Sequence, residues 1–526
     1  MNRTCPARSA PWAGALMLSG LLAPPALLQP GLAQAPSPQP APRPAPVLRP
    51  QTVAPLSGGL DRVLLVNDNN PELIREPGIL LSTFPKAGRG VPEAHLDVAL
   101  NGRFDLFSHH VYAGQSESPN STLWLAVLAA PRGSQPVSLK LLSGSTALSQ
   151  AVDPGQAGAP FLPLPALMAQ GSTPIYAGPG SRVATELLAR QRSAELPASW
   201  TLSPGAPTTL IVLPLPVRGL DPLLNGRNLQ LRLESSAPVS LATLAAFGSG
   251  NAPPPASAWA ALLEAGLSPR EHAPTPRGSK GSLVYSRVSG VQVGSTWRTR
   301  LTDPGQSWLS VRRAPISWPI SSLERGSLGS AQVQTAELQA FYPGTAWAAH
   351  GNYGVEYDLS IPLRNDTPKP VALQLALESP LKGDAAAGGL RFHSSPGNRP
   401  VMFRGTVEVT GLDGEPAPSG APGRPAGRRS FHLVQRAGEP GPALGTVSLA
   451  PGASRQLQVR LIYPADATPP QVLSLLPAEA GATAAAGAAA VGGAAVGAAP
   501  GMAMPNAAPA PGPAVKQSPS KPSTAP

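Results

Sequence analysis

The feature that most constrains the fold is a strand pattern that occurs twice, 234 residues apart. Residues 123–142 read LWLAVLAAPRGSQPVSLKLL and residues 357–376 read YDLSIPLRNDTPKPVALQLA. Each copy is an apolar run, a polar turn, and Pro-Val followed by strict alternation. This predicts two strands with one buried face, because successive side chains in a strand point to opposite sides. The identical positions are Leu125, Pro136, Val137, Leu139 and Leu141 in the first copy and Leu359, Pro370, Val371, Leu373 and Leu375 in the second.

A second correspondence follows in the same order in both halves. TLSPGAPTTLIV (201–212) matches SLAPGASRQLQV (448–459) at an offset of 247 residues. Identical positions include Leu202, Pro204, Gly205, Leu210 and Val212, matched by Leu449, Pro451, Gly452, Leu457 and Val459. Between the two halves lies a Pro-rich passage, residues 251–279, which is the best boundary in the composition.

Apolar runs bounded by Pro and Gly recur every ten to fifteen residues between the two ends of the chain; Leu229–Leu233 and Leu283–Val288 are examples. Such spacing favours antiparallel sandwiches over alternating βαβ units. We therefore expect a mainly all-β chain with two immunoglobulin-like antiparallel β-sandwich domains, at 56–250 and 280–475. Few short helices are expected. Ser181 is a predicted cap for one of them and Ser257 for another inside the Pro-rich linker.

The first 33 residues have the features of a secretory signal peptide. Arg3 and Arg8 precede a mostly apolar stretch, and Gly31 and Ala33 fit a cleavage site ahead of Gln34. An uncleaved membrane anchor is the alternative, but prolines interrupt the apolar run. Residues 34–55 predict an extended Pro-rich spacer, and residues 476–526, rich in Ala, Gly and Pro, predict a disordered tail.

Removal of the signal peptide would leave no cysteine, because the chain's single one is Cys5. Thiolate chemistry and Cys-ligated metals are then excluded. The formal net charge of +11 indicates little about nucleic acid, since only 13% of residues are charged and most of the 40 basic residues are Arg. This charge is consistent with a mild attraction to anionic envelope polymers. We expect no nucleic-acid partner.

Several phrases resemble a known family: NNPELIREPGILLSTFP (69–85), GRFDLFSHHV (102–111), YAGPGSRV (176–183), LPVRGLDPLLNGR (215–227), AAHGNYGVEY (348–357) and FHLVQR (431–436). They are similar to a cyanobacterial family of exported proteins catalogued as a domain of unknown function, number 3370 in that series. The resemblance covers about 60–470 and implies an envelope or secreted protein. It implies no activity, ligand or catalytic residue.

Candidate metal ligands are few. His109 and His110 follow Asp105, but neighbouring side chains of a strand point to opposite faces, so both imidazoles are not expected on one metal ion. One of them is able to pair with His350, which precedes the repeated strand of the second half. A hydrogen-bonded structural histidine is the competing interpretation.

Three further motifs have two interpretations each. The loop Asn67-Asp68-Asn69-Asn70-Pro71-Glu72 offers hard oxygen ligands, of which Asp68 and Glu72 are charged, to calcium, or is an ordinary tight turn. The stretch Gly178-Pro179-Gly180-Ser181 is an anion-binding turn or a helix start. Four tryptophans form either a sugar-binding strip or buried core: Trp297, Trp308, Trp318 and Trp347.

No GxSxG elbow, P-loop or HExxH motif is present. We therefore expect no catalytic residue and no cofactor, with calcium as the one cofactor considered. The favoured function is a non-catalytic cell-envelope or extracellular binding or structural protein, with an envelope polymer or protein as partner. The alternative is an enzyme or carbohydrate-binding protein acting on envelope polysaccharide or peptidoglycan. The expected location is the periplasm, outer envelope or extracellular space, without a transmembrane anchor once the signal is cleaved; the oligomeric state stays open.

Overall fold

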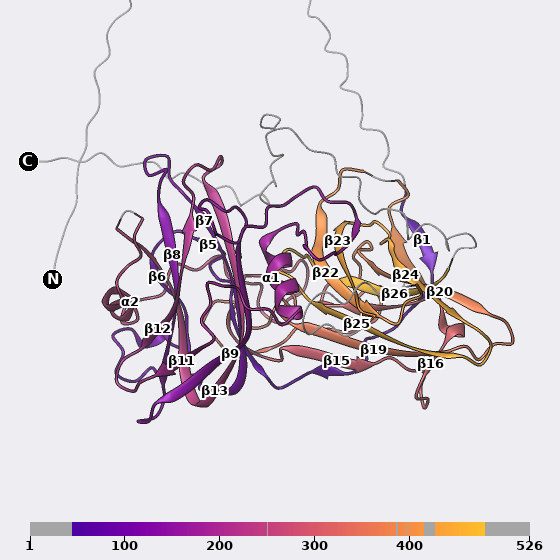
Figure 1. Cartoon of the computed structure of the whole chain (residues 1–526), viewed down its shortest axis with the longest axis horizontal. Coiled ribbons are helices and arrows are strands. Elements are labelled where there is room, and N and C mark those ends of the chain that lie inside the picture. Colours follow the sequence, from indigo (N-terminus) through magenta and orange to yellow (C-terminus); the bar gives the residue numbers. More distant parts are fainter. Residues whose placement is uncertain (1–44, 250, 386–387, 396, 415–426, 479–526) are drawn as a thin grey trace, which may run out of the picture. The chain divides into compact units, whose positions relative to one another are not determined.

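Strands arranged in four sheets make up most of the protein (Figure 1). The computed structural model describes residues 45–478 apart from 250, 386–387, 396 and 415–426. The predicted signal peptide, residues 34–44 of the predicted spacer, and residues 479–526 of the predicted tail lie outside the described residues, whereas the rest of the spacer contains the short strands β1 (Val47–Pro50) and β2 (Thr52–Val53). Within the described part β structure predominates and the two α-helices are short, which confirms the prediction of a mainly β fold.

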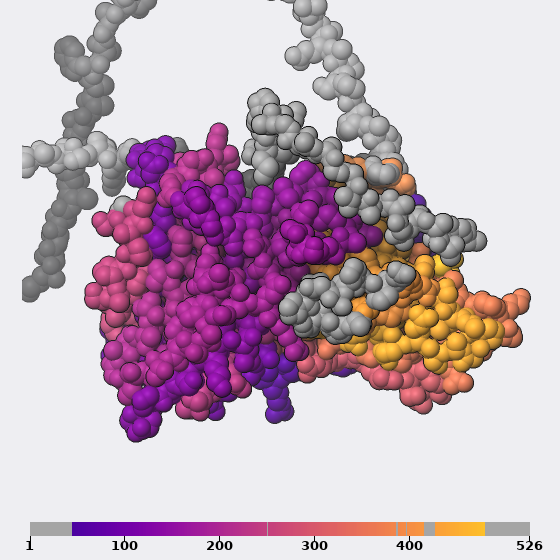
Figure 2. Space-filling view, viewed as in Figure 1, coloured from indigo at the N-terminus to yellow at the C-terminus, as the bar shows by residue number. Residues whose placement is uncertain are grey.

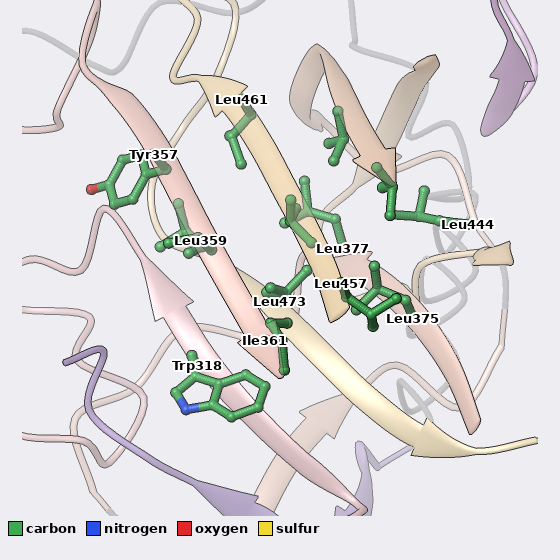
Figure 3. Packing of buried hydrophobic residues seen from close by; sticks show 14 of the residues in the cluster. Trp318, Tyr357, Leu359, Ile361, Leu375, Leu377, Leu444, Leu457, Leu461 and Leu473 are labelled. Atoms are coloured by element: carbon green, nitrogen blue, oxygen red, sulfur yellow. The ribbon is translucent and has the colours of Figure 1, made fainter. Parts of the chain in front are cut away.

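The second half of the chain forms a sandwich of an eight-stranded and a five-stranded sheet. Alternating apolar residues of both sheets meet in the largest core of the molecule, where Leu359 and Leu457 of one sheet approach Leu375 and Leu473 of the other (Figure 3). The eight-stranded sheet has the order β10 (Leu167–Ala169), β23 (Arg429–Arg436), β22 (Val401–Thr410), β25 (Ser454–Ile462), β19 (Glu356–Arg364), β15 (Thr296–Arg300), β3 (Gly59–Leu60), with β16 (Leu309–Ser310) also on β19. The five-stranded sheet has the order β2 (Thr52–Val53), β17 (Ile316–Ile320), β26 (Gln471–Pro477), β20 (Val371–Glu378), β24 (Ala443–Leu449).

The first half is one eleven-stranded sheet that is folded over by its longest strand, β13 (Leu224–Phe247). Up to Ser235 this strand pairs with β7 and β9. After a register shift Val239 still pairs with Leu100 of β7, and from there on the strand pairs with β8 and, from Ala242, with β6. The irregularity between Ser235 and Val239 lets one strand serve two layers. The remaining strands are β4 (Leu64–Asp68), β5 (Leu73–Ile74), β6 (Gly78–Ser82), β7 (Leu100–Ala113), β8 (Thr122–Pro131), β9 (Val137–Leu148), β11 (Ser199–Leu202), β12 (Thr208–Pro216), β14 (Ser289–Val293) and β18 (Leu338–Phe341).

The repeated sequence pattern forms equivalent strands in the two halves. The first copy is β8 and β9, the second is β19 and β20, and in neither half do the two strands pair with each other. β9 pairs with β11 as β20 pairs with β24, and the register is the same: Val137 lies opposite Leu202, and Val371 lies opposite Leu449. The orders β11-β9-β13-β7 and β24-β20-β26-β17 therefore correspond, with every pair antiparallel.

Segments from the early part of each half join sheets of the other half. β14 and β18 extend the first-half sheet beyond β4, whereas β2 and β3 pair with β17 and β15 of the second half. A separate pair joins β1 (Val47–Pro50) to β21 (Gly389–Phe392). The predicted domain boundary at 251–279 stays a prediction. Leu283–Val288 was expected to be a strand, but pairing begins only at Ser289.

Neither of the two predicted N-cap residues, Ser181 and Ser257, is the N-cap of its helix. α1 (Pro179–Leu188) has Gly178 as its N-cap residue, and the Ser181 hydroxyl donates to the carbonyls of Ala177 and Gly178 instead. α2 (Ala256–Leu262) starts after Pro255, so Ser257 lies within its first turn. In each case a proline with its fixed φ is what starts the helix. Figure 1 shows α1 between the first-half strands β9 and β13 and the second-half strand β22, all of which it contacts.

Candidate functional site

One face of β7 lies against the second half of the chain. The Phe107 ring stacks on Tyr353, with 6.2 Å between the ring centres. On the neighbouring strand the Gln230 amide donates to the carbonyl of Gly354 at 2.7 Å. Gly354 has φ +80°, and a β-carbon there would stand 3.1 Å from Cβ of Phe107, so only glycine fits this close approach comfortably. His109 extends from the same face two residues further along, because alternate side chains of a strand share a face.

His109 opens into a polar cavity of about 390 Å³, within the usual range of about 300–1,000 Å³ for ligand sites. We call it the histidine cavity. Its lining includes His109 and His350 together with Glu72, Tyr353 and Asp466. Sequence-distant loops therefore meet here: the Asx-rich loop, the segment before β19, and the segment after β25.

His109 and Glu72 form a charge pair inside the histidine cavity. The Nε2 atom of His109 lies 3.6 Å from Oε1 of Glu72, and its Nδ1 is 2.9 Å from Oδ1 of Asn228. Burial opposes charge on the imidazole, but the neighbouring carboxylate outweighs it and raises the pKa of His109. Burial also opposes charge on Glu72, but His109 and the paired Arg287 guanidinium hold its pKa down at about 2. Both members are therefore held in their charged forms.

His350 differs from His109 because, among the residues that the structure describes, no carboxylate forms an ion pair with it. Its ring lies edge-on to Tyr353, with 5.2 Å between ring centres. Burial, together with the charge of Arg287, lowers the pKa of His350 to about 4, so the ring is neutral at physiological pH. Its Nδ1 atom is buried and has no hydrogen-bond partner within residues 45–478 as described, which leaves one polar atom available to a ligand.

Asp466 contributes the second carboxylate of the cavity and caps α1. Its Oδ2 accepts the backbone N–H of Ser181 at 2.8 Å. The Gly178-Pro179-Gly180-Ser181 turn is a helix start, and the backbone N–H that an anion could have used donates to a carboxylate of the chain itself. Gly178 is required there, since a β-carbon would stand 2.3 Å from that oxygen. Burial raises the pKa of Asp466 to about 6, although Ser181, His109 and Arg404 all favour its ionised form.

Cationic side chains dominate the wall and mouth of the cavity. Arg404 is half-buried, its guanidinium lies 5.0 Å from the centre of the Phe161 ring, and its buried Nε atom has no acceptor in the described part of the chain. Lys382 and Arg325 are exposed at the mouth, and partial desolvation lowers the pKa of Lys382 to about 8. With Arg287, four permanent or near-permanent cations face two carboxylates. An anion is therefore favoured in this cavity.

His110 has a different environment. Its Nε2 lies 2.9 Å from Oδ2 of Asp68 and its Nδ1 lies 2.8 Å from the carbonyl oxygen of Pro71. Both ring nitrogens are thus engaged inside the first half, as the structural interpretation of this histidine requires. Of the metal candidates, the structure brings His109, His350 and Glu72 to one cavity and takes His110 and Asp68 away from it. No group of three or more potential ligand side chains in the described residues is arranged to hold a metal ion.

The oxygens of the predicted calcium loop diverge. Asp68 is turned toward His110 and Ser108, whereas Asn69 and Glu72 line the histidine cavity. Asn67 is hydrogen-bonded to Gln292 at 2.9 Å. The calcium site stays a prediction that this spread of ligands does not favour.

The four tryptophans do not form one strip. Trp297 and Trp318 are buried in the second-half core. Trp308 and Trp347 are half-buried and are covered by the guanidinium groups of Arg364 and Arg277.

Sequence reasoning missed the residues that define the charge of the cavity. Asp466, Arg404 and Lys382 lie in loops or strands with no motif around them, and only the fold brings them to His109. Asp105, which the sequence places near His109, instead pairs with Arg103 at the other end of β7.

Fold and cavity together define a mainly β protein with a polar cavity that is lined by more cationic than anionic side chains. A family model described as "Protein of unknown function (DUF3370)" matches residues 51–477, so the chain belongs to that family. A comparison with curated proteins found no match. In the described residues, none of the helices is both long enough and apolar enough to cross a membrane.

Proposed function

We propose that this protein is an exported, non-catalytic binding protein of the cell envelope or extracellular space, and that it takes a small anionic ligand in the histidine cavity. The observation that carries the proposal is the imbalance of charge in that cavity. Arg287, Arg325, Lys382 and Arg404 line it against two carboxylates, one of which, Glu72, is neutralised by Arg287 and His109. The signal-like first 33 residues and the absence of cysteine after them support export.

The chemistry of the lining indicates the kind of ligand. Arg404 offers an unused buried N–H, His350 offers an unused ring nitrogen, and Asn69 has a buried side-chain oxygen without a donor in the described part. A ligand that satisfies all three carries an anionic group together with hydroxyl groups. A single acidic sugar has both, and its size suits a volume of about 390 Å³.

Titration calorimetry of the exported chain with galacturonate, inorganic sulfate and neutral galactose tests the proposal. Galacturonate is expected to bind and galactose is not. Arg404→Gln removes a charged donor, which costs roughly tenfold in affinity or more. Lys382→Gln at the mouth costs about two- to fivefold, and the exposed Lys280→Gln is the matched control. Equal binding of galactose and galacturonate, or equal losses in Lys382→Gln and Lys280→Gln, would refute the anionic ligand.

A hydrolase acting on envelope polysaccharide is the second candidate, favoured by one specific observation. The pKa values of Asp466 and Glu72, which both interact with His109, are driven apart, to about 6 and about 2. Such separation is how one site supplies an acid and a base. Release of reducing ends from isolated envelope polysaccharide, lost in Asp466→Asn with ligand affinity retained, would replace the non-catalytic proposal.

A further inference from the structure

A second charged site lies at the other end of the β7 face. It is a groove of about 510 Å³, and six arginines line it: Arg103, Arg190, Arg232, Arg298, Arg428 and Arg460. They come from β7, α1's end, β13, β15, β25 and the segment before β23, so both halves contribute. We call it the arginine groove. In Figure 2 the indigo-to-magenta first half and the orange-to-yellow second half meet in the face that is seen.

Alternating charges fix the floor of the arginine groove. The order is Arg103, Asp105, Arg232, Glu356, Arg460, Glu408, Arg428, and the successive N···O distances are 2.9, 3.8, 2.7, 2.6, 3.5 and 3.0 Å. The acids are buried and each touches two arginines. These guanidinium groups are therefore held in one geometry before any ligand arrives, which lowers the conformational entropy that binding costs.

The rim carries charge that the floor does not neutralise. Arg298 is 75% exposed and lies 3.5 Å from the carboxylate of Asp358. Arg190 is exposed and has no ion pair in the part of the chain that the structure describes. Around the groove six arginines meet four carboxylates, those of Asp105, Glu356, Asp358 and Glu408. The groove therefore has an excess of positive charge.

The backbone at Arg190 is a second, independent indication. Arg190 directly follows the C-cap of α1 with φ +56°, in the left-handed region where helices commonly end on glycine. Residues with a β-carbon are disfavoured in this backbone conformation. An arginine in a strained backbone position that lines a charged groove indicates a use for its side chain.

We propose that the arginine groove binds an acidic polysaccharide through its carboxylate or sulfate groups. The guanidinium fork matches planar or tetrahedral oxyanions with two parallel hydrogen bonds. No aromatic side chain is among the described residues that line the groove, whereas single-stranded nucleic acids are held by stacking on such side chains. This site is separate from the histidine cavity and does not depend on the ligand proposed there.

Binding of the full chain to immobilised dextran sulfate and polygalacturonate, with neutral dextran and a single-stranded oligonucleotide for comparison, tests the proposal. Both acidic polymers are expected to bind, more weakly as salt rises, and neutral dextran is not. Binding of neutral dextran as well, or of the oligonucleotide more tightly than either acidic polymer, would overturn the assignment.

Two rim variants separate a binding role from a structural one. Arg190→Gly removes the charge and relieves the backbone, so affinity should fall about two- to fivefold while the melting temperature stays the same or rises. Arg298→Gln should cost a similar factor, and the double variant about tenfold. Arg75→Gln, an exposed arginine outside both sites, is the control. A double variant that binds like the wild type, or a control that loses as much, would refute the proposal.

Arg404→Gln distinguishes the two sites. This variant should keep polymer binding at the arginine groove although it loses the small anion of the histidine cavity. Loss of both in this single variant would show that the polymer occupies the cavity and not the groove.

Discussion

Replacing Asp466 with asparagine should stabilise the protein at neutral pH and leave its stability unchanged in acid. The pKa of this carboxyl group is raised from 3.8 to about 6 by burial. Its folded state therefore binds the proton more tightly than the unfolded chain. The stabilisation from protonation is complete below about pH 4 and is lost as the pH rises through 6, so ionised Asp466 destabilises the fold above that pH.

The magnitude follows from the size of the shift. About two pKa units at about 1.4 kcal/mol each give an upper bound of about 3 kcal/mol. Because the side chain is half-buried and solvent screens part of its charge, we expect a gain of about 1–3 kcal/mol for Asp466→Asn at pH 7.5. The amide oxygen of asparagine still accepts the N–H of Ser181, so the cap of α1 is kept.

Thermal and urea unfolding of both proteins at pH 4.5, 6.0 and 7.5 provides the assay. The difference should be near zero at pH 4.5 and should grow with pH. Glu76→Gln, at an exposed carboxylate outside the cavity, should show no such trend. A loss of stability in Asp466→Asn of equal size at all three pH values would refute the reasoning, because it would mean that the ionised carboxylate holds α1 in place.

Three further predictions test other parts of the structure. Glu72→Gln should lower the pKa of His109 in an NMR titration, and an unchanged His109 pKa would contradict the charge pair. The same variant should lose about 1–3 kcal/mol of unfolding free energy at pH 7. Because the folded pKa of Glu72 is depressed, this loss should disappear as the pH falls from 4.5 toward 2. Glu356→Gln should cost about 3–5 kcal/mol of unfolding free energy, because it leaves two largely buried arginines without their shared partner; a cost below about 1 kcal/mol would show that solvent screens the floor of the groove. Leu373→Ala, in the second copy of the repeat, should cost about 2–5 kcal/mol through the cavity it leaves, whereas the half-buried Val371→Ala should cost less.

Much of the strand arrangement was accessible from the sequence. Alternation identifies β9 and β20 because each buries one face. The matched Pro-Gly segments predict the alternating strands that follow them, β12 and β25, whereas the pairing of β11 with β9 and of β24 with β20 is given by the structure. The correspondences, at offsets of 234 and 247, even contain the shared register, since Val137 and Leu202 map onto Val371 and Leu449. Register was predictable here because the turn and the buried face were repeated together.

The cavity was accessible only in part. His109 and His350 were candidates because they have comparable places in the two halves, Glu72 was one because it belongs to the Asx-rich loop, and the strand period separates His109 from His110. Asp466 and Arg404 had no such signal. Their positions depend on pairings between strands hundreds of residues apart, which local alternation does not encode.

The N-terminal strands β1, β2 and β3 find their partners late in the chain. Residues 47–60 pair with β21, β17 and β15, the nearest of which begins at Thr296. At about 5–20 residues per second of synthesis, these first-made strands wait on the order of ten seconds or longer for their neighbours to exist. Until then their edges have no partner in the sheets they will join, so the pairing of these first strands is completed only after β15, β17 and β21 have been made. A version lacking residues 45–60 would lose those edges permanently and should refold with the second-half sheets exposed to association.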